Sequence, residues 1–293
     1  MSEPLENLRA PRFSQHMAQG HSFRVAQWPA VRGQRARPLL FFSGIGANIE
    51  LLAPFLEEMR GRDVITFDMP GVGGTPPFSR PYRLSTMAKA AREILTDLGI
   101  ADVDVMGVSW GGMLAQEFAY RGRQSVKNLV LAATSAGMPM IPGDPSTLVK
   151  MLGSHRYADA LSIDAYLQTL YGGSNRDLGT YAARMQAPTS IGYWHQVMAI
   201  IGWTSVRKLT RVRAPTLILM GADDRLLPPS NGQILKFLSR NARLEVLAGA
   251  GHLFVLTHRD AAVKMIEGFL DRSSVTVSAR ATPGTPIHAG AAH

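Results

Sequence analysis

The sequence predicts an α/β fold in which a mostly parallel sheet is covered by helices on both faces. Short apolar runs alternate with longer amphipathic segments along the first half of the chain, which is the pattern of consecutive strand–helix units. The 293 residues are 46% hydrophobic and 18% charged, which is enough apolar material for one large core. Around Ser109, a glycine-rich junction joins an apolar run to an amphipathic segment and fits the same pattern.

The first six elements follow from this alternation. We expect three strand–helix pairs at residues 39–42 and 51–59, 64–67 and 86–98, and 103–106 and 113–120. In the second helix the apolar residues recur at helical spacing, Ser85 is placed to cap the start, and Gly99 is placed to end it.

The second half of the chain supplies the rest of the sheet. Strands are expected at residues 129–133, 216–220 and 244–247, followed by a last helix at 261–270. Residues 1–135 and 206–272 then form the core. Residues 273–293 are too small and polar to bury apolar area worth their ordering entropy, so this tail is predicted to be disordered.

Between residues 136 and 205 the alternation breaks. A plain loop of this length between two strands is unusual, so we expect an inserted helical cap over the carboxyl ends of the strands. The segment holds five of the seven tyrosines and two of the four tryptophans, and collectively these aromatics indicate an apolar pocket wall. The candidates for substrate contact are Tyr171, Trp194 and Trp203, although any single aromatic here is as well explained by packing of the cap.

Composition excludes several classes of function. The chain contains no cysteine, which rules out disulfides, a cysteine nucleophile and thiolate metal sites, and no histidine or carboxylate cluster has metal-ligand spacing. The net charge is +9, but the basic residues are scattered and are not interleaved with stacking aromatics, so we expect no nucleic-acid partner. The amino-terminal residues lack an apolar signal segment and no apolar run is long enough to span a membrane, which favours a cytoplasmic location.

The junction G-V-S-W-G-G at residues 107–112 has the pattern of a nucleophile elbow. The sharp turn forces an unfavourable backbone conformation on Ser109, and the close approach of neighbouring chains requires glycines around it. A serine hydroxyl is a weak nucleophile, so a functional elbow requires a histidine and an acid further along the chain.

Both partners are present in the expected order. Asp224 follows the strand expected at 216–220 and is preferred over its neighbour Asp223 because it lies three residues after Gly221. His252 lies in a glycine-rich loop between the last expected strand and the last helix. We expect Asp224 to orient His252, and His252 to take the Ser109 proton and later return it to the leaving alcohol.

An acyl-transfer site also needs main-chain donors for a negatively charged oxygen. We expect one from the amide of Trp110, directly after the nucleophile, and one from the amide of Ile45 in the loop after the strand at 39–42. A second glycine-rich loop at 68–74 is not followed by the helix start that a phosphate site needs, so it is interpreted as structural. No nucleotide or other cofactor is implied.

These motifs resemble the α/β-hydrolase superfamily over nearly the whole chain. More narrowly, the chain is similar to intracellular poly(3-hydroxyalkanoate) depolymerases that act on medium-chain-length polyester. The motifs that carry this resemblance are F-S-G-I-G-A-N at 42–48, P-G-V-G-G at 70–74, G-V-S-W-G-G at 107–112, Y-G-G at 171–173, G-W-T-S at 202–205 and G-H-L-F at 251–254.

The resemblance implies hydrolysis of ester links in a storage polyester, at the surface of its cytoplasmic granule, to hydroxyacid monomers or oligomers. Attachment to the granule does not carry over residue by residue, because the arginine-rich amino terminus and the tail lie outside the matching motifs. Two alternatives stay open: a carboxylesterase, lactonase or carbon–carbon bond hydrolase acting on a small soluble substrate, and a granule-binding protein without catalysis. Related enzymes that use an aspartate at the elbow are disfavoured by Ser109.

Overall fold

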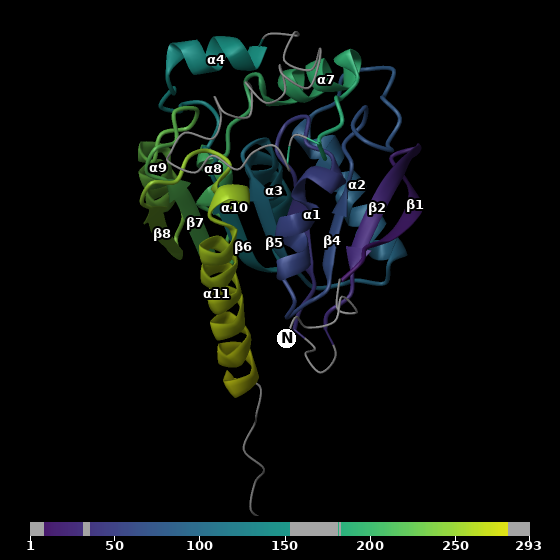
Figure 1. Cartoon of the computed structure of the whole chain (residues 1–293). Coiled ribbons are helices and arrows are strands. Elements are labelled where there is room, and N and C mark those ends of the chain that lie inside the picture. Colours follow the sequence, from purple (N-terminus) through teal and green to yellow (C-terminus); the bar gives the residue numbers. More distant parts are fainter. Residues whose placement is uncertain (1–8, 32–35, 153–180, 182, 281–293) are drawn as a thin grey trace, which may run out of the picture.

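The fold is a single mixed sheet between two layers of helices (Figure 1). The computed structural model describes residues 9–31, 36–152, 181 and 183–280. Two apolar clusters fill the space on either side of the sheet, and each is composed of sheet residues together with the helices of that face. The predicted α/β architecture with helices on both faces is therefore confirmed.

Six of the strands are parallel and run through the centre of the sheet to one edge. Across the sheet the order is β1-β2-β4-β3-β5-β6-β7-β8. The strands are β1 (Arg12–Ala18), β2 (His21–Trp28), β3 (Leu39–Phe42), β4 (Val64–Phe67), β5 (Val103–Val108), β6 (Val126–Ala132), β7 (Thr216–Gly221) and β8 (Ala242–Leu247). All six expected strands are present, with ends that shift by a few residues. Because β3 to β8 run in the same direction, their following loops gather at one edge of the sheet.

The antiparallel hairpin of β1 and β2 was not among the predicted elements. Its two-residue turn places Gln19 and Gly20 at φ 49° and 74°, the left-handed conformation that suits a tight hairpin. The more exposed face of β1 carries the apolar Phe13 and Met17, whereas Ser14 and His16 lie on the less exposed face, so the alternation of buried apolar and exposed polar residues that marks a strand is missing.

Different helices pack against the two faces of the sheet. One face is covered by α2 (Leu84–Asp97), α3 (Trp110–Arg121), α8 (Val206–Leu209) and α9 (Ser230–Leu238). The other is covered by α1 (Ile49–Glu58), α10 (Phe254–Thr257) and α11 (Arg259–Arg280). In the segment between β6 and β7, the described residues include α4 (Pro145–Leu152) and α7 (Ser190–Ile200), which lie beyond the carboxyl ends of the strands (Figure 1).

Two helix boundaries differ from the expectation. The N-cap of α2 is Arg83 rather than Ser85, because the buried Leu84 already belongs to the first turn, and the cap has no side-chain hydrogen bond. Gly99 does end this helix, with φ 71° and its amide bonded to Thr96. The last helix, α11, continues to Arg280 through the first eight residues of the segment predicted to be disordered, because neither glycine nor proline occurs between Gly268 and Pro283.

The division into core, cap and tail remains a prediction. Residues 153–180, 182 and 281–293 lie outside the described part of the chain. In the part that is described, no helix is both long and apolar enough to cross a membrane.

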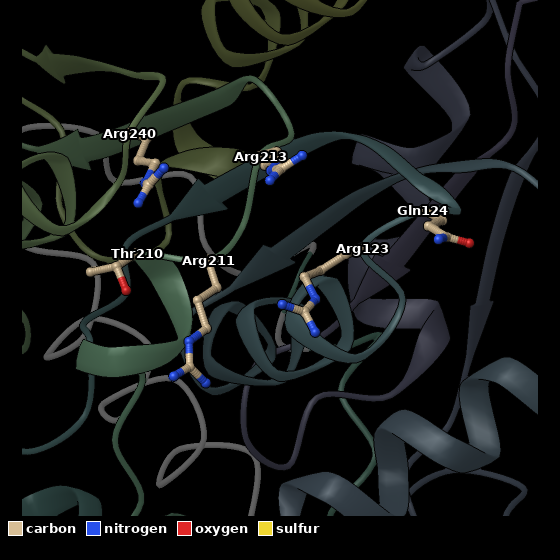
Figure 2. A pocket seen from close by; sticks show the side chains of 6 residues that line it. All are labelled: Arg123, Gln124, Thr210, Arg211, Arg213 and Arg240. Carbon is tan, nitrogen blue, oxygen red and sulfur yellow. The ribbon is translucent and has the colours of Figure 1, made fainter.

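A basic pocket lies at the opposite edge of the sheet from the loops that follow the strands. It is lined by Arg123, Gln124, Thr210, Arg211, Arg213 and Arg240 (Figure 2). Arg123, Arg211 and Arg240 each lie two residues after the last residue of a helix, directly after its C-cap: α3, α8 and α9, respectively. Cations are stabilised at helix carboxyl ends, so the fold accounts for this cluster without a ligand.

Candidate active site

Ser109 occupies a strained turn between β5 and α3. Its backbone has φ 55° and ψ −119°, a conformation that side-chain-bearing residues adopt only when the surroundings enforce it. Two hydrogen bonds do so: the Ser109 amide donates to Ala132 (2.9 Å), and the Thr134 hydroxyl donates to the Ser109 carbonyl (2.7 Å). The elbow geometry predicted from the sequence is therefore present.

The glycines around Ser109 are required by close approach of main chains. A methyl group on Gly107 would lie 2.1 Å from the carbonyl oxygen of Gly111, and one on Gly111 would lie 2.2 Å from that of Phe42. Neither neighbour is a flexible side chain that can move aside. The three elements β3, β5 and α3 thus meet at the elbow with no room for Cβ atoms.

Replacing Gly111 by alanine is expected to lower the free energy of unfolding by about 3 kcal/mol, because the new methyl must displace the end of β3. Urea unfolding measures this loss. Gly268→Ala is the matched control: it lies in α11, its new methyl would meet only the Arg272 guanidinium at 3.7 Å, and helix propensity predicts a gain of about 0.5–1 kcal/mol. Equal effects of the two substitutions would contradict the packing argument.

Ser109, His252 and Asp224 form a continuous chain of hydrogen bonds. His252 Nε2 lies 2.9 Å from Ser109 Oγ, and His252 Nδ1 lies 2.8 Å from Asp224 Oδ2. All three residues are buried, at 8%, 2% and 4% exposure. They come from the loops that follow β5, β8 and β7, so the parallel sheet brings together side chains 143 and 28 positions apart.

The hydrogen-bond partners determine the orientation of the Asp224 carboxylate. Its Oδ1 accepts from the amides of Leu226 and Leu227, both at 2.9 Å, which leaves Oδ2 for His252. A carboxylate only accepts, so His252 Nδ1 carries the proton and Nε2 is left to accept from the Ser109 hydroxyl. Asp223, the alternative acid, is exposed.

The loops that carry the acid and the histidine are bonded to each other. The Asp223 amide donates to Ala250 (2.9 Å), and the Ala222 amide donates to Leu247 (2.9 Å). A methyl on Gly221 would lie 2.3 Å from the Ala250 carbonyl oxygen, which explains glycine at the end of β7. The distance between Asp224 and His252 is therefore set by main-chain contacts.

Residues 43–48, which we call the β3 loop, lie against the nucleophile. A methyl built on Gly44 would contact Ser109 Cβ at 3.7 Å. The predicted donors, the amides of Ile45 in this loop and of Trp110 at the first position of α3, have no acceptor among the residues that are described. The amides of Ile45 and Trp110 therefore remain the predicted donors.

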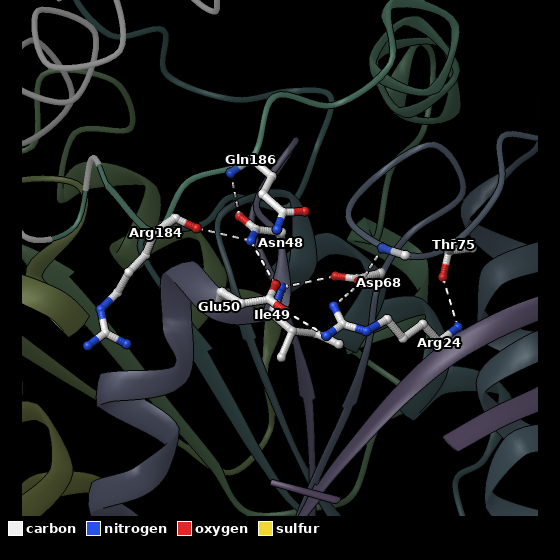
Figure 3. Close-up of polar contacts among 9 residues, drawn as sticks. Arg24, Asn48, Ile49, Glu50, Asp68, Thr75, Arg184 and Gln186 are labelled. Carbon is white, nitrogen blue, oxygen red and sulfur yellow. Dashed lines mark hydrogen bonds and ion pairs between the residues drawn. The ribbon is translucent and has the colours of Figure 1, made fainter. Parts of the chain in front are cut away.

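A buried polar network holds the β3 loop to the body of the protein (Figure 3). Asp68 is fully buried and accepts from the amides of Ile49 and Gly74, both at 3.0 Å, and from Arg24 at 3.1 Å. Burial raises the pKa of Asp68, although these three donors oppose the shift. Arg24 also binds Glu50 at 2.6 Å, so the carboxylate that anchors the loop is itself held in place.

The same network reaches the segment between β6 and β7. The Asn48 side chain donates to the Arg184 carbonyl (3.1 Å) and accepts from the Gln186 amide (3.2 Å) (Figure 3). Asp68 belongs to the glycine-rich 68–74 loop, for which the sequence predicts a structural role. The loop beside Ser109 is therefore tied to both the sheet and the cap segment.

The aromatic residues proposed for substrate contact differ in position. Tyr171 lies outside the described residues. Trp194 is on α7 and is 48% exposed. Trp203 is buried, and its indole donates to Glu117 (3.0 Å), so this side chain is anchored on α3. His195 is also buried, with its ring edge-on to Tyr82 and 6.1 Å between centroids.

The carboxylate of Glu117 joins the cap segment to α3. Besides Trp203 it accepts from Arg121 (2.7 Å) and from Lys208. Burial raises the pKa of Glu117, but the hydrogen bonds from Lys208, Trp203 and Arg121 outweigh this and leave the pKa below its ordinary value.

Glu117→Gln is expected to lower the free energy of unfolding at neutral pH by about 2 kcal/mol, less than for a fully buried pair because Lys208 and Arg121 keep contact with solvent. The contribution of a carboxylate with a lowered pKa is complete above its unfolded pKa of about 4.3 and is lost as the pH falls through the folded value. We therefore expect the difference in the free energy of unfolding between the wild-type protein and the variant to be smaller at pH 3 than at pH 7. An unchanged difference would contradict this account.

Comparison with known proteins places the chain in a family. Residues 37–259 match the family model of the alpha/beta hydrolase fold, and the chain belongs to this family. It is 41% identical over 240 residues to poly(3-hydroxyalkanoate) depolymerase of Ectopseudomonas oleovorans, with 80% of this chain and 84% of the relative covered.

Other relatives are more distant. The chain is 27% identical to 2-hydroxy-6-oxo-2,4-heptadienoate hydrolase of Pseudomonas putida, over 80% of this chain and 88% of the relative. Among solved structures, the enol-lactonase of Burkholderia xenovorans superposes with a TM-score of 0.74 at 20% identity, covering 88% of this chain and all of that one (100%). This last likeness shows the fold alone.

Proposed function

We propose that the protein is a serine hydrolase that cleaves ester bonds of poly(3-hydroxyalkanoate), with medium-length side chains favoured, through an acyl-enzyme. The hydrogen-bond chain from Ser109 through His252 to Asp224 carries the proposal. The 41% identity to a poly(3-hydroxyalkanoate) depolymerase supports the choice of substrate.

In the first half-reaction, His252 Nε2 takes the proton of Ser109 as Oγ attacks the ester carbonyl carbon. The carbonyl oxygen becomes negatively charged and is stabilised by the amides of Ile45 and Trp110. When the C–O bond of the ester breaks, His252 returns its proton to the departing oxygen, which leaves as the hydroxyl of the neighbouring unit. The acyl group remains on Ser109.

In the second half-reaction, His252 takes a proton from a water molecule that attacks the acyl carbon. The tetrahedral species collapses, the proton moves to Ser109 Oγ, and a hydroxyacid or its oligomer is released. The Asp224 carboxylate stabilises the protonated imidazole in both halves without itself accepting the proton.

The test is a comparison of substrates. We expect the purified protein to hydrolyse p-nitrophenyl octanoate faster than p-nitrophenyl acetate and to release hydroxyacids from medium-chain-length polymer granules. A preference for the acetate with intact granules would favour a hydrolase of small soluble esters, lactones or carbon–carbon bonds. Failure of a fluorophosphonate probe to label Ser109 would favour a granule-binding protein without catalysis.

The outer face of the cap segment supports action at a cytoplasmic granule surface. Of the twelve large hydrophobic residues that are exposed in the described part of the chain, seven lie between positions 138 and 201. Three of these, Ile191, Trp194 and Met198, form a stripe on α7 at positions i, i+3 and i+7, and the C-cap residue Ile201 follows directly after the helix; the four are between 45% and 73% exposed. An exposed apolar stripe of this kind suits contact with a water-insoluble polymer.

The double substitution Ile191→Ser with Ile201→Ser is expected to lower adsorption to polymer granules about tenfold or more, because two large apolar side chains lose their contact with the polymer. Hydrolysis of p-nitrophenyl octanoate should be unchanged. Co-sedimentation with granules measures adsorption. Phe237→Ser is the matched control, since Phe237 is 88% exposed on α9, outside the cap segment. An equal loss in the control would contradict a role specific to α7.

A further inference from the structure

The side chain of Gln196 links α7 to the β3 loop beside Ser109. Gln196 is fully buried, with no exposed surface. Its Oε1 accepts a hydrogen bond from the amide of Gly46 (3.1 Å), 150 positions away in the sequence. Its main-chain oxygen accepts from the indole nitrogen of Trp110 (2.8 Å), the residue that directly follows the nucleophile. One residue of the cap segment therefore contacts both sides of the proposed oxyanion site.

The nitrogen of the same side-chain amide, Nε2, has no hydrogen-bond partner in the part of the chain that the structure describes. Because a main-chain N–H can only donate, the Gln196 oxygen must face Gly46, and this fixes the direction of the nitrogen. Nε2 is buried, and no atom of the described residues accepts a hydrogen bond from it. A buried donor left unpaired is unfavourable, and such groups in native proteins call for an explanation.

A ligand with an acceptor oxygen near the reacting carbonyl supplies that explanation. Gly44 lies against Ser109, and Gly46 is two residues further along the same loop, so Gln196 is bonded to the loop that borders the nucleophile. Resting on the function proposed above, the substrate has such an oxygen: each unit of a 3-hydroxyacyl polyester carries one on carbon 3, only two carbons from the carbonyl. It is an ester oxygen within the chain and a hydroxyl at its end.

We propose that Gln196 is a specificity residue that recognises this oxygen. Nε2 donates a hydrogen bond to the oxygen on carbon 3 of the acyl unit, while Oε1 keeps the β3 loop in place. The site then distinguishes a 3-hydroxyacyl ester from a plain fatty acyl ester of equal length, because only the former satisfies the buried donor. The same contact fixes how far the acyl chain enters the site.

The test measures kcat/KM for p-nitrophenyl 3-hydroxyoctanoate and p-nitrophenyl octanoate, and compares their ratio among variants. We expect the wild-type protein to prefer the hydroxylated ester, and Gln196→Met to lower this ratio roughly tenfold to a hundredfold. Gln196→Met also removes the acceptor for Gly46, which slows both substrates and cancels in the ratio. Gln196→Glu keeps that acceptor and lacks the donor, so its ratio should fall in the same way.

Gln233→Met is the matched control, since Gln233 is an exposed residue of α9 and its loss should leave the ratio unchanged. Equal losses on both esters in the two Gln196 variants, with an unchanged ratio, would overturn the proposal and leave Gln196 a residue that only positions the loop. Granule hydrolysis by the wild-type protein is scored separately. A protein that keeps the ratio effect and fails on granules would refute the polyester function without touching this inference.

Discussion

Replacing Ser109 by alanine is expected to lower kcat for p-nitrophenyl octanoate by a factor on the order of 10⁵ to 10⁶. The hydroxyl oxygen is the proposed nucleophile, and none of the described side chains offers another hydroxyl or thiol bonded to His252. The Ile45 and Trp110 amides would remain, so any residual hydrolysis should come from stabilisation of a negative oxygen during direct attack by water. Steady-state assays at enzyme concentrations in the micromolar range would measure it.

We do not expect a folding defect to cause this loss of kcat. The polar contact of Ser109 Oγ in the structure is with His252, and alanine retains the Cβ that packs near Gly44. The Tm of the variant is therefore expected to stay close to that of the wild-type protein. Unreduced turnover by a well-folded Ser109→Ala protein would contradict the proposed mechanism, and so would continued labelling by a fluorophosphonate probe.

Asp224→Asn is expected to lower kcat by a factor of about 10⁴. The carboxylate accepts from Leu226 and Leu227 through one oxygen and from His252 through the other. An asparagine has only one oxygen. If that oxygen stays with the two amides, the new NH₂ group faces His252 Nδ1 and requires it to be an acceptor. The proton then moves to Nε2, and the imidazole can no longer accept from Ser109.

Asp223→Asn provides the control for this experiment. It is the same chemical change one position earlier, at an exposed residue. We expect kcat within about twofold of the wild-type value, as for surface substitutions in general. A larger loss in Asp223→Asn than in Asp224→Asn would reverse the assignment of the acid. The pH dependence of kcat/KM in both variants would show whether His252 still titrates as the base.

The parts of the site that follow strands were predictable from sequence. A nucleophile elbow needs glycine on both sides of the serine, and the contacts of Gly107 and Gly111 show that steric demand directly. The loops of Asp224 and His252 could be placed because each follows a short apolar run, and carboxyl ends of parallel strands meet at one edge. Local composition and the geometry of the sheet sufficed for these residues.

Residues whose roles depend on distant contacts could not be found in this way. Gln196 lies in a helix with no local pattern that distinguishes it, and its partners are 86 and 150 positions away. Trp203 belongs to the same aromatic-rich segment as Trp194, yet the buried Glu117 holds it against α3. Ser85 does not cap α2, because burial of the neighbouring Leu84 in the first turn contributes more to stability than a single capping hydrogen bond.

The order in which the three loops occur along the chain has a consequence for synthesis. Ser109 is synthesised early, but His252, the residue proposed to activate it, is 143 residues further on, in a loop bonded to the end of β7. A nascent or truncated polypeptide that ends before residue 252 therefore holds a hydroxyl without a base. Under the proposed mechanism, we therefore expect a polypeptide that lacks the loop of His252 to hydrolyse esters far more slowly than the full chain.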